Sequence, residues 1–220
     1  MLKAISEDER SGRPMSIVFR DDQYIPIQGM YGSTWRGDWQ RAGAGTLIEH
    51  SIHDVDLLEY LCGPISSVTA RSHNFHGLDG IEDTFAAAIA FATGTVGTLA
   101  SIWHDVLERP SLRQIEIFTE RLWCRQDGSD WYGPVRWRRT GAAEEELGGD
   151  GLLARVYEAG LTEPNPDVQF IRCVQEGRPA SPGFATAVRA HAIVDALYVS
   201  AAAEGAPVTV IDPLGRSMAG

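Results

Sequence analysis

The stretch EDTFAAAIAFATGTVGTLASIW, residues 82–103, has the pattern of a β-hairpin. Its two halves, 82–91 and 96–103, are rich in aromatic, β-branched and small residues, and Thr93-Gly94-Thr95 between them is typical of a tight turn. Side chains of a strand alternate between two faces. This hairpin is therefore the point from which the rest of the fold is predicted.

The first strand of the hairpin has one large apolar face and one small uncharged face. The apolar residues are Phe85, Ala87, Ile89 and Phe91, and the small residues are Thr84, Ala86, Ala88 and Ala90. A strand face exposed to water normally carries charges. The pattern therefore predicts that the small face packs against a second subunit, or that an extra helix or loop covers it, and the sequence leaves both possibilities open.

Further strand patterns flank the hairpin, and helical patterns lie toward both ends of the chain. The expected strands are 15–19, 65–75, 112–119, 122–126, 131–139 and 208–211. The expected helices are 2–11, 46–61, 166–176 and 185–204, whereas 21–45 and 140–151 have no clear period. This order predicts an α+β fold: one open, mostly antiparallel sheet with helices packed on one face.

The composition excludes several classes of partner. The formal net charge is −11, and a nucleic acid or an anionic membrane needs a basic surface. The charged N-terminus lacks the apolar region of a signal peptide, and no apolar run is long enough to span a bilayer. The three cysteines, Cys62, Cys124 and Cys173, lack a C-x-x-C spacing and are expected to be buried thiols. We expect a cytoplasmic protein.

The helix expected at 46–61 carries the groups best suited to chemistry. At 100° per residue, Glu49, His53, Asp56 and Tyr60 fall within a stripe about 60° wide. Histidine exchanges a proton most readily near neutral pH, and a carboxylate one helical turn away can fix its tautomer. The stripe therefore predicts an acid/base site.

Two other interpretations of this helix remain open. Thr46 and Glu49 also have the spacing of a capping box, in which Glu49 would bond only the Thr46 N–H. His50 and Asp54, like His53 and Asp56 of the stripe, are residue types that bind metals. However, His50 and His53 are three residues apart, whereas a zinc-binding pair on a helix is expected to be four apart. We therefore assign no metal ligands.

The segment Gly43-Ala-Gly45-Thr-Leu-Ile-Glu49-His-Ser-Ile-His53-Asp-Val-Asp56 resembles the G-G-G-x-x-x-D-x-x-x-H-x-x-D signature of the Gfo/Idh/MocA oxidoreductase family. As in that family, a leucine-rich helix, a strand and a hairpin that begins with an acidic pair, Glu82-Asp83, follow. The ending at 205–210 is also similar. The resemblance covers most of residues 12–211.

The resemblance implies a fold and a set of roles. Family members join a Rossmann domain that binds NAD or NADP to a C-terminal domain like that of glyceraldehyde-3-phosphate dehydrogenase. The open sheet of this domain packs subunits into homo-oligomers. His53 would be the general acid/base, with Glu49 as its catalytic partner. Glu49 stands where the family usually has aspartate, and ~1 Å matters at a reacting centre, so its role is the less certain of the two.

A dinucleotide-binding motif is not evident. Gly43-Ala-Gly45 is the nearest match to G-x-G-x-x-G, but Ile48 takes the third glycine position and no strand precedes it. Lys3, the single lysine, is not in the E-K-P motif of the family's nucleotide domain. We expect 1–13 to be the remnant of an interdomain helix, 14–211 the substrate domain and 212–220 a tail. Without a cofactor domain, the chain alone should neither bind NAD(P) tightly nor turn over.

Aromatic and polar residues around the helix suggest the kind of substrate. Tyr24 and Trp35 could stack on or enclose a sugar, Arg20 could bond its hydroxyl groups, and Asp56 would contribute from the helix. We expect a sugar, a polyol or a related hydroxylated small molecule. The alternative is a non-catalytic sugar-binding or oligomerisation protein that kept the fold without the chemistry.

Overall fold

A computed structural model describes residues 1–128, 133–158, 160 and 165–215. The strands are β1 (Pro14–Tyr24), β2 (Ile65–His73), β3 (Thr84–Phe91), β4 (Val96–His104), β5 (Leu112–Thr119), β6 (Leu122–Gly128), β7 (Val135–Arg139), β8 (Glu144–Leu147) and β9 (Val208–Thr209). The helices are α1 (Leu2–Ser6), α2 (Trp39–Ala42), α3 (Ile52–Cys62), α4 (Gly149–Glu158), α5 (Pro166–Gln175) and α6 (Phe184–Ala202). A π-helical turn, Leu47–Ser51, runs directly into α3.

The strands form one sheet in the order β8-β7-β6-β5-β1-β4-β3-β2-β9. β1 lies at the centre, antiparallel to β5 and parallel to β4, so that Phe19 is opposite Ile115 on one side and Leu99 on the other. All other neighbouring pairs are antiparallel. The predicted open, mostly antiparallel sheet is therefore confirmed.

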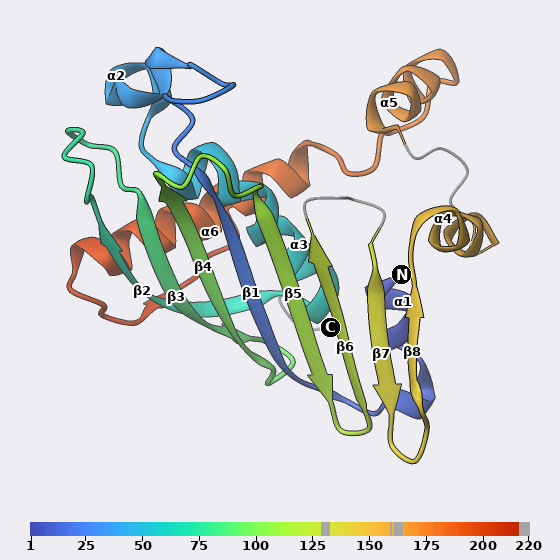
Figure 1. Cartoon of the computed structure of the whole chain (residues 1–220). Coiled ribbons are helices and arrows are strands. Elements are labelled where there is room, and N and C mark those ends of the chain that lie inside the picture. The colour runs from blue at the N-terminus through green and yellow to red at the C-terminus, as the bar shows by residue number, and fades with distance from the viewer. Residues whose placement is uncertain (129–132, 159, 161–164, 216–220) are drawn as a thin grey trace.

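Helices α3 and α6 lie together behind the sheet (Figure 1). Their apolar side chains meet those of β1 and β3 in one core, whose fully buried members include Phe19, Leu58, Phe85, Ile193 and Leu197. Burial of such a side chain contributes roughly 1.5–3 kcal/mol each. The prediction that helices pack on one face is confirmed, and this packing fixes α3 against the sheet.

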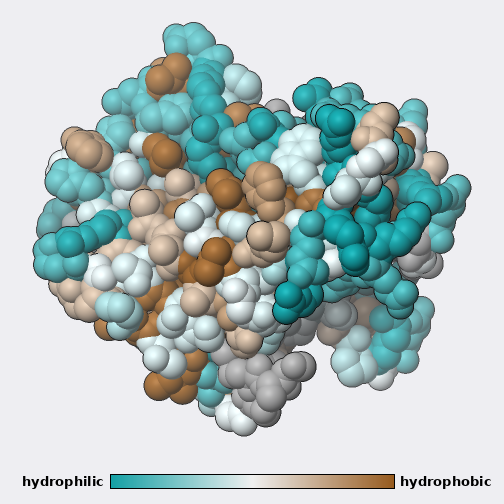
Figure 2. Space-filling model, turned by 90° about the horizontal axis from the view of Figure 1, so that it is seen from below, coloured by the Kyte–Doolittle hydropathy of each residue, from teal (hydrophilic) through white to brown (hydrophobic). Residues whose placement is uncertain are grey.

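The opposite face of the sheet is not covered by a helix of the described residues. Phe85 and Ile89 of β3 are buried, whereas Ala86 and Ala88 between them are exposed, as the alternation predicted. The extra helix or loop considered for this face is therefore absent from the described part of the chain. Seen from the end of the sheet, hydrophilic residues gather on the side of β7 and β8, while pale and apolar residues occupy the middle (Figure 2).

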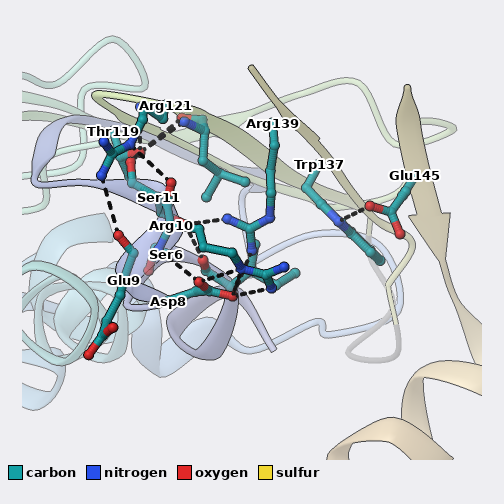
Figure 3. A network of polar contacts seen from close by, with 12 residues as sticks. Ser6, Asp8, Glu9, Arg10, Ser11, Thr119, Arg121, Trp137, Arg139 and Glu145 are labelled. Carbon is teal, nitrogen blue, oxygen red and sulfur yellow. Dashed lines mark hydrogen bonds and ion pairs between the residues drawn. The ribbon is translucent and has the colours of Figure 1, made fainter. Parts of the chain in front are cut away.

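The N-terminal segment is fastened to β5, β6 and β7 by a polar network (Figure 3). Arg121 Nε donates to the Arg10 carbonyl oxygen over 3.1 Å, and Arg139 Nη2 lies 3.3 Å from Asp8 Oδ2. Ser11 is fully buried and accepts from the hydroxyl of Thr119 through its carbonyl oxygen. Residues 1–13 thus pack as part of this domain, and their expected origin in an interdomain helix stays a prediction.

Several boundaries differ from the sequence prediction, including the following three. β1 continues to Tyr24, because the charges of Asp21 and Asp22 that interrupt its apolar pattern are buried in ion pairs. The expected loop 140–151 contains β8, whose Glu146 pairs across the ladder with Arg136, and the start of α4. The expected helix 2–11 is divided into α1 and a 3₁₀ turn at 9–11.

Candidate active site

Two glycines and a buried acid fix the start of the helix that carries His53. Gly43 has φ +89°, a conformation that side chains other than hydrogen rarely adopt. A Cβ on Gly45 would lie only 1.8 Å from the Glu82 carbonyl oxygen, and the Glu82 carboxylate accepts the Gly45 N–H over 2.7 Å. The glycines of the motif are therefore needed for a turn and for close contact with the sheet.

The capping-box interpretation of this helix is wrong. The Thr46 N–H donates to the Glu82 carbonyl oxygen, and Thr46 itself is helical, with no cap from its side chain. Its hydroxyl lies 2.7 Å from that of Ser101 on β4 instead. Glu49 is consequently free of the cap, and its carboxylate accepts from Arg36 Nε.

The pairing of Glu49 with Arg36 brings the preceding loop to the helix. The Arg36 guanidinium also lies 4.7 Å from the ring centroid of Trp35. Arg36 therefore contacts both Glu49 and Trp35. The side chain of Glu49 is 12% exposed. The π turn at 47–51 is an irregularity of the kind frequently found at functional sites.

His53 is exposed and lines a groove of about 290 Å³ between α3 and α6. The groove contains two residues of the expected stripe, His53 and Asp56, together with Ile52, Pro182, Thr186, Ala187, Ala190 and His191. No described residue forms a hydrogen bond with the His53 ring. The imidazole is thus available to a molecule in the groove.

His191 is a groove residue that the sequence analysis did not identify. It is on α6, far from His53 in the chain, and helix packing alone brings the two together. Its Nδ1 lies 2.9 Å from the Ala187 carbonyl oxygen, an acceptor, which assigns the proton to Nδ1 when the ring is neutral. Nε2 is then left as a hydrogen-bond acceptor.

Of the other three members of the stripe, Asp56 lines the groove with His53, whereas Glu49 and Tyr60 lie outside it. Asp56 remains beside His53, and burial followed by the charge of Glu59 raises its pKa, against the opposing effect of His53. Glu49 does not line the groove, because it turns toward Arg36. Tyr60 is 59% exposed and packs under the ammonium group of Lys3.

Three predicted substrate residues do not line the groove of His53: Trp35, which lies against Arg36, and Arg20 and Tyr24. Arg20 is on the open face of the sheet, away from the helices, where its Nε lies 3.0 Å from Asp22 Oδ2. Tyr24 is buried at the end of β1, its ring centroid 5.4 Å from that of Tyr31. The strand alternation sends Arg20 to the wrong face for this groove, so neither residue contributes to it in this structure.

A buried cluster of charged residues supports the helix from below. His50 Nε2 lies 3.0 Å from Asp21 Oδ2, and Arg113 Nη2 lies 2.7 Å from Asp21 Oδ2 and 3.0 Å from Asp54 Oδ1. Asp21 and Asp54 are almost fully buried. The i,i+4 spacing of His50 and Asp54 was visible in the sequence, but their partners on β1 and β5 were not.

Burial and charge act in opposite directions on this cluster. Burial raises the pKa of Asp54 to about 7 in spite of Arg113. Burial would lower the pKa of His50, but the hydrogen bond and charge of Asp21 prevail and raise it. Burial would likewise raise the pKa of Asp21, and His50 and Arg113 hold it below its usual range. The cluster is therefore structural and sensitive to pH.

The described residues contain no group of three or more histidines, cysteines or acids that could hold a metal ion. None of the helices among these residues is both long and apolar enough to cross a membrane.

The sequence profile described as the GFO/IDH/MocA C-terminal domain matches residues 1–125. The chain belongs to the GFO/IDH/MocA family. A relative, the 1,5-anhydro-D-fructose reductase of Ensifer adhaerens, is 28% identical over 109 residues, which are 48% of this chain and 30% of that protein. The chain thus spans less than a third of this relative.

Solved structures confirm the fold. Levoglucosan dehydrogenase, solved with NADH and levoglucosan, superposes with a TM-score of 0.78 at 20% identity, covering 96% of this chain and 62% of that one. The WlbA dehydrogenase of Bordetella pertussis, solved with NADH and UDP-GlcNAcA, gives 0.74 at 21% identity, with 96% and 60% covered. At these identities the likeness establishes the shared fold alone.

Proposed function

We propose that this chain is the substrate-binding and acid/base part of an NAD(P)-dependent oxidoreductase that acts on a sugar, a polyol or a related hydroxylated molecule. The observation that carries the proposal is the exposed His53 in the α3–α6 groove, beside Asp56 and with no hydrogen bond to a described residue. Family membership and the sugar ligands named for the relatives support this substrate class.

In this proposal, His53 receives or donates the proton of the reacting hydroxyl or carbonyl group. Asp56, one turn further along α3, lies beside the imidazole in the same groove. Glu49 acts from outside the groove through its pairing with Arg36, which joins the aromatic loop at Trp35 to the helix. Arg20 and Tyr24 have no role at this groove.

NAD or NADP is the cofactor that the NADH complexes of the relatives support. The glycine-rich start of the helix does not fit its pyrophosphate, since the Glu82 carboxylate already accepts the N–H groups of Gly45 and Leu47 there. A second anion beside that carboxylate would be repelled. We therefore assign no described residue to the dinucleotide, and proton transfer at His53 is the only step that we derive.

We also propose a cytoplasmic homo-oligomer that forms through the open sheet face. The exposed, uncharged residues Ala86 and Ala88 support this interface, because a second copy of the chain can cover them without burying a charge. The three cysteines are free and buried, as in a reducing compartment.

Calorimetric titration with levoglucosan and with 1,5-anhydro-D-fructose tests the proposed function. We expect binding that His53→Ala abolishes and that His73→Ala, at an exposed histidine on β2, leaves intact. Binding that is indifferent to both His53 and Glu49 would support the non-catalytic alternative, which the comparisons do not support. Titration with NAD(H) should show no tight binding, and a low-micromolar affinity would refute our inference that no described residue binds the dinucleotide.

A further inference from the structure

Glu82 is a buried acid that the proposed chemistry does not use. It directly precedes β3 and is 9% exposed. Its carboxylate accepts three hydrogen bonds. Oε2 accepts from the Gly45 N–H over 2.7 Å, and Oε1 accepts from the Leu47 N–H and from the Tyr198 hydroxyl, both over 2.9 Å. One side chain thus joins the sheet, the start of the His53 helix and α6.

The three partners explain why this position holds a carboxylate. All of them are donors, and an ionised carboxylate offers only acceptors, whereas the amide of glutamine would turn an NH₂ group toward one of them. A negative charge is also stabilised at the start of a helix. Burial and then the charge of Glu82 raise the pKa of Tyr198, so its hydroxyl keeps the proton that it donates.

The backbone continues the connection from Glu82 to the site. The Glu49 N–H donates to the Gly45 carbonyl oxygen over 3.1 Å, so the residue held by Glu82 begins the turn that carries Glu49. Ser101 on β4 holds the same turn through the hydroxyl of Ser51, 2.6 Å away. α3 follows at once, with His53 as its second residue.

We propose that Glu82 is the positioning residue of this site, whose carboxylate fixes the register of the π turn and thereby the placement of Glu49 and His53. The inference rests on the proposed function, because that function makes the placement of these two side chains important. Glu82 touches neither the groove nor, in this proposal, the substrate.

The test compares Glu82→Gln with Glu120→Gln in the full chain. Glu120 is a surface acid paired with Arg13 and serves as the matched control. In Glu82→Gln, we expect the amides of Gly45 and Leu47 to exchange with solvent about tenfold faster, since hydrogen bonds to charged groups are lost. We expect the NMR signals of the His53 ring to move at fixed pH, while the control changes neither property.

Unchanged His53 signals in Glu82→Gln, with Gly45 and Leu47 exchanging faster, would overturn the proposal and leave Glu82 with a local structural role. If Glu82→Gln does not fold, Tyr198→Phe replaces it, because the ring can keep its contact with Phe85 while one donor is lost. The same changes, but smaller, are then expected. Amide exchange and the NMR signals of His53 can be measured without sugar binding. A failure of the proposed function would appear in the sugar titration of His53→Ala and can therefore be distinguished from a failure of this inference.

Discussion

Arg113 Nη2 bridges Asp21 and Asp54, at 2.7 Å from Oδ2 of the first and 3.0 Å from Oδ1 of the second. One cation therefore pairs with two buried acids, Asp54 on the helix that carries His53 and Asp21 on β1. With His50 neutral the cluster has one excess negative charge, and the second oxygen of Asp54 finds no partner among the described residues. Burial is the main reason why the pKa of Asp54 is raised to about 7, and the charge of Asp21 adds to it against the opposing charge of Arg113.

The first prediction concerns the pH dependence of stability. A carboxyl group whose pKa is raised in the folded state binds its proton more tightly there than in the unfolded chain. Its contribution is therefore greatest below pH 4 and is lost as the pH rises toward 7. Asp54→Asn removes this loss. From pH 5 to pH 8, we expect the free energy of unfolding to fall in both proteins, but by about 2 kcal/mol less in the variant than in the wild type.

Urea unfolding at pH 5, 6, 7 and 8 measures this difference. His50 contributes in the same direction in both proteins, because its raised pKa gives stability that is lost as the pH increases. Asp150→Asn, at an exposed acid in the first turn of α4, is the control and should follow the wild type. Parallel pH profiles for wild type and Asp54→Asn would show that Asp54 is ionised throughout.

The second prediction concerns Gly45. Replacement by alanine places a Cβ 1.8 Å from the Glu82 carbonyl oxygen. This oxygen belongs to the backbone, which cannot move aside to relieve the clash as the end of a flexible side chain could. We expect Gly45→Ala to lower the free energy of unfolding by about 3 kcal/mol or more. Gly148→Ala is the matched control, since its Cβ would meet its nearest neighbour, Pro134, at an ordinary 3.4 Å. Equal unfolding midpoints for the two variants would contradict the close contact.

The third prediction concerns the ion pair of Glu49 with Arg36. The pair is largely withdrawn from water, so its energy should exceed that of a surface pair. We expect Arg36→Met to cost about 1–2 kcal/mol, and much less when Glu49→Gln is already present. A double-mutant cycle by urea unfolding gives the coupling free energy. A coupling near zero would mean that the aromatic loop is not held to the helix by this pair.

The sequence predicted those parts of the fold whose patterns are local. The hairpin 82–103 follows from its alternation and from Gly94, which has φ +87° in the turn. The extent of β1 and the existence of β8 did not follow, because Asp21 and Glu146 look like loop residues until Arg113 and Arg136 are placed opposite them. Ion pairs between distant segments are not visible in a local pattern.

The same limit applies to the candidate site. Helical periodicity placed His53 and Asp56 together correctly, since both are on one helix. It could not show that Arg36 draws Glu49 aside, or that α6 brings His191 into the groove. Arg20 was misjudged because its strand was expected to end before it, and the alternation of a longer β1 turns its side chain to the open face.

The fourth prediction concerns the open sheet face. Ala88 is exposed on this face, and the same face carries exposed Val18 on β1 and exposed Phe118 on β5, further along the sheet. If two copies pack here, Ala88→Arg would bury an unpaired charge at the interface and dissociate them. Light scattering at micromolar concentration should show an oligomer for the wild type and a monomer for the variant. A monomeric wild type would rule out this interface.

The fifth prediction concerns His191, which faces the same groove as His53. Because the Ala187 carbonyl oxygen accepts a hydrogen bond from the protonated Nδ1 of the neutral ring, Nε2 can accept a hydrogen bond from a sugar hydroxyl group. His191→Phe keeps the ring but removes this acceptor, and we expect about a fivefold weaker affinity for the sugar, since one neutral hydrogen bond is lost. Because the position is exposed, the free energy of unfolding should stay the same.

Calorimetry with the sugar that binds the wild type best measures this change. His191→Gln is the matched comparison, because its side-chain oxygen can accept the same hydrogen bond and should restore part of the affinity. His73→Ala controls for the loss of an exposed histidine elsewhere on the surface. If phenylalanine and glutamine at position 191 bind the sugar as tightly as histidine does, the sugar does not contact this side of the groove, and His53 must act on a molecule held by other residues.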